Sequence, residues 1–258
     1  MLSDSFLLCA VVCMIFSMYV ALLWFEPSRG KAIRTVLILL PFGFFVNLLG
    51  DYELSGEYGY HIVQHLTRAV PLLLFLLGYF VLRNHWKQAL LSIGIWYPIN
   101  HILHTIISDI DRRDVPVGDT FVEQYASLLL VVGLIFGLGY TWLFVRACVG
   151  KTNISKWEMI LTTSAIEGLT PFLLFYLNLA ATFLISLFTP TATISLAVAS
   201  LFSIGAGVVC FSGITHYVWN TPLKRSLIYS LCCYSIPAIL IYILQTIIIA
   251  YYPSRFDI

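Results

Sequence analysis

The chain has 258 residues, of which 60% are hydrophobic and 10% are charged, with a formal net charge of +1. An ordinary soluble domain carries about 25% charged residues, so the composition excludes a soluble globular domain and also excludes a disordered chain. It predicts a polytopic membrane protein, while the small net charge says nothing about partners.

Apolar segments long enough for a bilayer recur along the whole chain. A helix needs about 20 residues to cross the hydrocarbon core, and helices satisfy their own backbone groups in lipid. Eight segments reach or approach this length: 5–25, 33–50, 60–82, 88–108, 124–147, 158–188, 192–219 and 226–252. We therefore predict an all-α integral membrane protein, a polytopic bundle of about eight transmembrane helices that forms one membrane domain, 1–258.

Basic and acidic residues alternate between the loops of this arrangement. The loops after the first, third, fifth and seventh segments hold ten of the fourteen Lys and Arg residues, and the opposite side holds ten of the thirteen acids. The positive-inside rule then places these four loops in the cytoplasm and both termini outside. Tryptophans at the same segment ends agree with an interfacial belt. The predicted location is the plasma (cytoplasmic) membrane.

The two halves of the chain, 1–120 and 121–258, are weakly similar. Residues 8–31 and 128–151 match at several positions without gaps, and a separate pairing of the fourth and eighth segments matches Tyr97 with Tyr234. Two interpretations stay open. One is a parallel four-plus-four duplication, an arrangement that some transporters use. The other is chance identity, which an apolar composition raises.

Four histidines lie at helical spacing on the third and fourth segments. His61 and His65 can share one face of a helix, and so can His101 and His104. Neutral imidazole is the commonest transition-metal ligand, and two imidazoles from facing helices can ligate haem b. Neither face carries a carboxylate, and there is no HExxH motif. A metal site, a haem b site, a proton or ligand relay, and a purely packing role all remain open, with no cofactor as the leading expectation.

Two charged residues lie well inside predicted spans. Arg68 is in the third segment and Glu167 is in the sixth. A charge in the hydrocarbon core costs a few kcal/mol, and such groups usually face the bundle interior and find a partner. The two residues form either a structural ion pair or a centre that binds a substrate or coupling ion. Gly168 and Pro171 follow Glu167 and can unwind the helix locally there, but other predicted spans also contain proline, which membrane helices generally tolerate, so both arrangements stay open.

Gly133 and Gly137 in the fifth segment have GxxxG spacing. Small residues at this spacing let helix backbones approach closely. The pattern therefore predicts close helix packing, either within one chain or between two chains.

The leading hypothesis is a permease for a small molecule or ion, with Arg68, Glu167, Tyr97 and Asn100 along the pathway. The alternatives are a membrane-embedded enzyme that uses a metal or haem b at the four histidines, and a sensor or accessory subunit that signals to a cytoplasmic partner. Enzymatic activity stays uncertain and is not favoured, because P-loop, GxGxxG and GxSxG motifs are absent. Expected partners are the lipid bilayer, a small molecule or ion, and a second copy or a partner subunit, but no nucleic acid.

Overall fold

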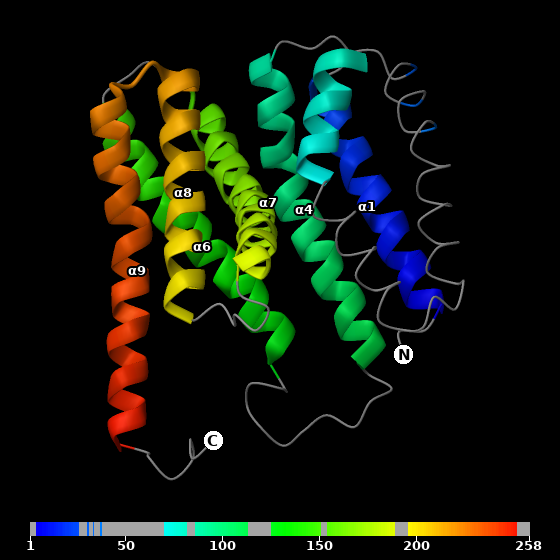
Figure 1. Cartoon of the computed structure of the whole chain (residues 1–258). Coiled ribbons are helices and arrows are strands. Elements are labelled where there is room, and N and C mark those ends of the chain that lie inside the picture. Colours follow the sequence, from blue (N-terminus) through cyan, green and yellow to red (C-terminus); the bar gives the residue numbers. More distant parts are fainter. Residues whose placement is uncertain are drawn as a thin grey trace. The chain divides into compact units, whose positions relative to one another are not determined.

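The computed structural model describes residues 4–25, 30, 33, 37, 70–81, 86–112, 125–150, 154–188 and 196–251. Nearly all of these residues are helical, and no strand occurs among them (Figure 1). This confirms the predicted all-helical class. The predicted segment 33–50 lies almost entirely outside the described residues, so eight spans and an internal repeat stay predictions.

The described helices overlap the remaining predicted segments. A π-helix, η1, continues the helical residues 70–76. The bounds are α1 Asp4–Phe25, η1 Leu77–Val81, α4 Trp86–Arg112, α6 Ala126–Val149, α7 Lys156–Phe188, α8 Leu196–Trp219 and α9 Leu223–Tyr251.

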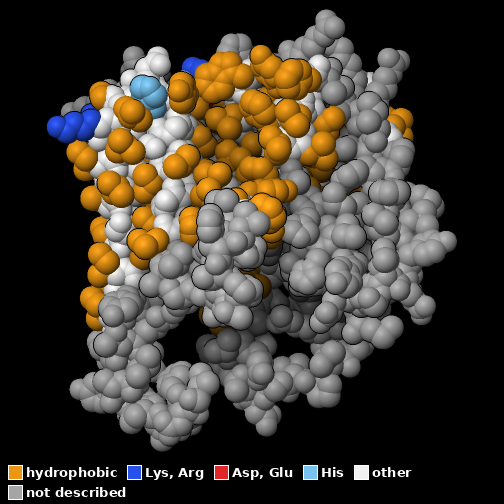
Figure 2. Space-filling model, viewed as in Figure 1, with side chains coloured by type: hydrophobic (Ala, Val, Ile, Leu, Met, Phe, Trp, Pro, Cys, Tyr) orange, Lys and Arg blue, Asp and Glu red, His pale blue; other side chains and the backbone are white. Residues whose placement is uncertain are grey.

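Within the described residues, three stretches are long and apolar enough to cross a membrane: Leu128–Val149 in α6, Lys156–Ala181 in α7 and Leu201–Trp219 in α8. Large apolar side chains on α6 are exposed, with Ile135 63% and Phe136 74% accessible. Figure 2 shows hydrophobic side chains over most of the described surface in view, with Lys and Arg side chains near the end where α8 and α9 connect. Apolar surface on this scale indicates association with a membrane. The orientation with both termini outside stays a prediction.

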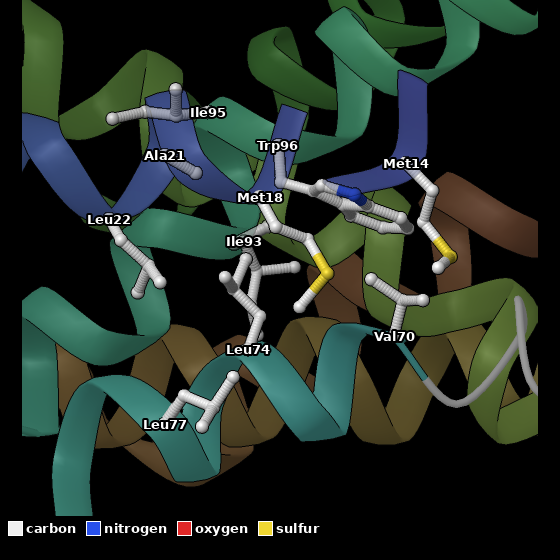
Figure 3. Close-up of a cluster of buried hydrophobic side chains, with 11 residues drawn as sticks. Met14, Met18, Ala21, Leu22, Val70, Leu74, Leu77, Ile93, Ile95 and Trp96 are labelled. Carbon is white, nitrogen blue, oxygen red and sulfur yellow. The ribbon is translucent and has the colours of Figure 1, made fainter. Parts of the chain in front are cut away.

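The chain forms two compact units, and α6 and α7 contribute to both. Unit 1 comprises Met1–Trp142 and Ile154–Phe172. In unit 1, α1 packs against α4, and buried side chains from these helices meet residues of 70–77 in one apolar core (Figure 3). This core consists of Met14, Met18, Ala21, Leu22, Val70, Leu74, Leu77, Ile93, Ile95, Trp96 and Ala165.

Unit 2 comprises Leu143–Asn153 and Leu173–Ile258. Its helices α8 and α9 pack side by side (Figure 1). They are joined by a tight turn in which Asn220 adopts a left-handed φ of 51°, a conformation that asparagine tolerates at helix ends. At the end of α6, Gly150 has a φ of 76° and donates its N–H to the carbonyl of Arg146 at 2.9 Å.

The start of α7 has a clear local cause. The backbone N–H of Glu158 donates to Ser155 Oγ at 3.1 Å, so Ser155 caps the helix and satisfies one of the backbone donors that a helix start leaves unpaired. Ser155 and Glu158 have the spacing of a capping box. This signal fixes where the helix that carries Glu167 begins.

The helix does not unwind near Glu167. Helix α7 runs from Lys156 to Phe188 with Pro171 inside it, so of the two open arrangements the structure has the tolerated proline. Proline removes one backbone hydrogen bond, whereas unwinding in an apolar environment would leave several polar groups unpaired, each at a cost of several kcal/mol. Keeping the helix and losing one bond is therefore the less costly arrangement.

Candidate functional site

Two glycines bring α4 and α7 into close contact within unit 1. A Cβ atom on Gly94 would overlap the main-chain carbonyl of Leu161, and a Cβ on Gly168 would lie 3.1 Å from the Cβ of Tyr97. Only residues without a side chain allow backbones to approach this closely. The contact places Tyr97 beside Gly168, the residue that follows Glu167.

A cavity of about 260 Å³ lies in the same unit. One water occupies about 30 Å³ in the liquid, so the cavity can hold a small solute. Helices α4, α6 and α7 all contribute to its wall. The lining residues are Tyr97, His101, Leu129, Leu130, Gly133, Leu134, Gly137, Leu138 and Glu167.

Gly133 and Gly137 form part of this wall, and neither has a side chain that could fill the space in front of it. A Cβ atom on either glycine would meet no atom within 4 Å. Among the described residues, the GxxxG spacing therefore produces no close packing within the chain, and close packing between two chains stays a prediction. Instead, the two glycines leave open the volume beside Glu167.

The carboxylate of Glu167 is held by a side chain from another helix. Thr141 Oγ1 in α6 donates a hydrogen bond to Glu167 Oε1. Other threonines of α7 bond within their own helix, as Thr162 does to the carbonyl of Glu158 at 2.7 Å and Thr170 to that of Ile166 at 2.8 Å. Such back-bonding satisfies a hydroxyl locally. Thr141 instead orients a carboxylate that lines a cavity.

His101 presents a buried polar atom to the same region. Its Nε2 is inaccessible and has no hydrogen-bond partner among the residues that the structure describes. Its ring centroid lies 6.1 Å from that of Tyr97. Buried polar atoms without a partner are uncommon and cost free energy. His101 lines the cavity, but its enclosed Nε2 is not open to an occupant in this arrangement.

The structure brings together only some of the predicted pathway residues. Tyr97 and Glu167 line the cavity together with His101. Asn100 is partly buried on α4 and is not one of the lining residues. Arg68 lies outside the described residues, so its pairing with Glu167 stays a prediction.

The predicted histidine cluster is mostly beyond the described part of the chain. His61 and His65 lie outside it, and His104 belongs to α4 without a described side chain. Within the described residues, no group of three or more His, Cys, Asp or Glu side chains could hold a metal ion. A transition-metal or haem b site at the four histidines therefore remains a prediction.

Sequence reasoning missed the contribution of α6 to this site. Gly133, Gly137 and Thr141 are spaced four residues apart, which places them on one face of a helix. A small polar residue on the glycine face of an otherwise apolar helix is a signal that could have identified the partner of Glu167.

No protein-family model matches the chain, and no curated protein or solved structure matches it. The class of the protein is therefore inferred from its own sequence and structure alone. The part of the chain that the structure describes is helical and has helices that can cross a membrane, and one of these helices carries a carboxylate to the wall of a cavity.

Proposed function

We propose that the chain is a multi-pass membrane permease for a small molecule or ion, with Glu167 at the centre of its pathway. One observation carries the proposal: the Glu167 side chain belongs to a helix that can cross a membrane, and it lines a cavity large enough for a small solute. Ionisable groups inside membrane spans are costly and mark substrate or ion pathways. A carboxylate kept in such a position needs a ligand or a partner.

The backbone near Glu167 supports the same role. Pro171 has no N–H, so the carbonyl of Glu167 lacks its usual helical donor. Pro98 has the same effect on the carbonyl of Gly94 in α4. Helices interrupted in their hydrogen bonding recur at transport sites, where backbone carbonyls contact substrates and ions.

Uptake into vesicles tests the proposal. The full chain is reconstituted in liposomes and given a mixture of amines, amino acids, carboxylic acids, sugars and alkali cations, with uptake quantified by mass spectrometry. We expect one solute class to enter faster than in protein-free vesicles. The Glu167→Gln variant is expected to lower that rate about tenfold or more, as loss of a charged hydrogen bond predicts.

Glu158→Gln is the matched control, because Glu158 is an exposed acid on the same helix and glutamine preserves the capping box. Its uptake rate should equal that of the wild type. The proposal fails when no solute enters faster than in protein-free vesicles, or when both variants transport equally well.

A further inference from the structure

The cavity beside Glu167 has a one-sided charge distribution. Among its nine lining residues, Glu167 is the single acid and none is Lys or Arg. Six of the nine are leucine or glycine and offer no polar side-chain atom. A carboxylate against such walls is poorly solvated, so an occupant that brings positive charge is favoured over an anion.

The walls and the size of the cavity disfavour a bare metal cation. Ca²⁺ takes six to eight oxygen ligands at about 2.3–2.6 Å. The lining side chains offer the carboxylate of Glu167 and the hydroxyl of Tyr97, while the leucines offer none. A cavity of about 260 Å³ is also much larger than one desolvated ion.

The cavity does suit a small cation with an apolar body. An ammonium N–H can donate to the carboxylate of Glu167 in a charge-assisted hydrogen bond. The ring of His101 also lines the cavity, but its Nε2 is enclosed, so Glu167 is the acceptor on which the site depends. The ring of Tyr97 provides a face for the positive charge, and the leucines of α6 contact the carbon chain.

We propose that this cavity binds a small organic ammonium ion, a protonated primary or secondary amine with a short apolar body. The proposal rests on the proposed function, because it names the substrate class of the same site. It also assigns a separate task to each helix: α7 supplies the charge, α4 supplies the aromatic and imidazole groups, and α6 supplies the apolar wall.

Binding to the full chain in lipid nanodiscs tests this proposal by isothermal titration calorimetry. The probes are methylammonium, n-butylammonium and benzylammonium, each compared with the corresponding carboxylate and alcohol. We expect at least one ammonium probe to bind, and its carboxylate and alcohol counterparts to bind at least tenfold more weakly. Glu167→Gln should weaken ammonium binding about tenfold or more, and Glu158→Gln should leave it unchanged.

A second pair of variants tests the location. Gly137→Leu places a side chain in the cavity, where a Cβ meets no atom within 4 Å, and should abolish binding without preventing folding. Gly139→Leu is the matched control, because Gly139 is equally uncrowded but does not line the cavity. Ammonium affinity should be unchanged in this control.

The outcomes separate the two proposals. Absence of binding by every ammonium probe, equal binding of the carboxylates, or wild-type affinity in Glu167→Gln would overturn the ammonium site. Glu167-dependent uptake of an anion or a sugar would overturn it too, but would leave the permease standing. Tight ammonium binding without uptake of any solute would keep the site and overturn the permease.

Discussion

The polar groups of the turn between α8 and α9 in unit 2 differ from those around the cavity in unit 1. In unit 2, the turn between α8 and α9 is closed by hydrogen bonds: His216 Nδ1 donates to the carbonyl of Thr221 at 2.7 Å, and the hydroxyls of Thr221 and Ser226 lie 2.6 Å apart. Arg225 Nη2 donates to the carbonyl of Ala147 at the end of α6, at 2.8 Å. Each of these groups uses a neighbour from its own unit.

Around the cavity in unit 1, the polar side chains of Glu167, Tyr97 and His101 lie beside open space instead. Glu167 has a single hydrogen bond, from Thr141, among the described residues, and His101 Nε2 has no described partner. Satisfied buried networks rigidify a structure, whereas partly satisfied ones cost free energy. The difference agrees with a structural role for the turn in unit 2 and with the proposed ligand site at Glu167 in unit 1.

The contact between α4 and α7 offers the test with the largest expected effect, because both helices contribute to the wall of the cavity. Gly94→Ala forces a Cβ against the main-chain carbonyl of Leu161, which cannot rotate away. We expect it to lower the free energy of unfolding by about 2–3 kcal/mol, in the range of overpacked cores. Unfolding in detergent micelles measures this effect.

In unit 2, Gly207→Ala meets the ring of Tyr234, a side chain that can shift. Its expected cost is about 1 kcal/mol, because a gain in helix propensity offsets part of the overlap. Gly213→Ala, where a Cβ would be free of contacts within 4 Å, is the control and should not destabilise. Equal stability of the Gly94→Ala variant and the wild type would show that the contact between α4 and α7 is not tight.

The turn of unit 2 provides the next test. Ser226 is fully buried, and Ser226→Ala leaves the hydroxyl of Thr221 without this partner. A loss of about 1–2 kcal/mol in the free energy of unfolding is expected, with no change in the uptake rate per folded molecule. Ser203→Ala, at an exposed position of α8, should change neither quantity. Slower transport by correctly folded Ser226→Ala would contradict a purely structural turn.

Thr141 is expected to give the smallest effect. Thr141→Val removes the donor to Glu167 while nearly preserving shape, and one hydrogen bond contributes about 1 kcal/mol. Uptake should therefore fall about fivefold, and Thr141→Ser should restore it. Thr170→Val is the control, because the hydroxyl of Thr170 bonds to its own helix. An equal loss of uptake in both valine variants would show that the hydrogen bond from Thr141 to Glu167 has no specific effect on transport.

The helices were predictable from the sequence because segment length and end signals are local properties. Apolar stretches located α6, α7 and α8, and the Ser155–Glu158 spacing marks a helix start. The sequence left open whether the helix unwinds at Pro171, and the cost of unpaired backbone groups in an apolar environment explains why it does not.

The candidate site was only partly predictable. Tyr97 and Glu167 were chosen because they are polar groups within apolar spans, and they line one cavity. Asn100 met the same criterion and does not line it. Spacing defines which residues share a face of one helix, but not which face meets another helix. The role of Gly133 and Gly137 depends on that second property, and so it emerged only from the packing.

The most direct test of this difference measures stability and uptake on one preparation of Glu167→Gln. Uptake should fall about tenfold or more, while the free energy of unfolding stays the same or rises, because removing a buried charge is often neutral or stabilising. The opposite result is a less stable protein whose uptake per folded molecule equals that of the wild type. It would show that Glu167 stabilises the fold and has no role in transport.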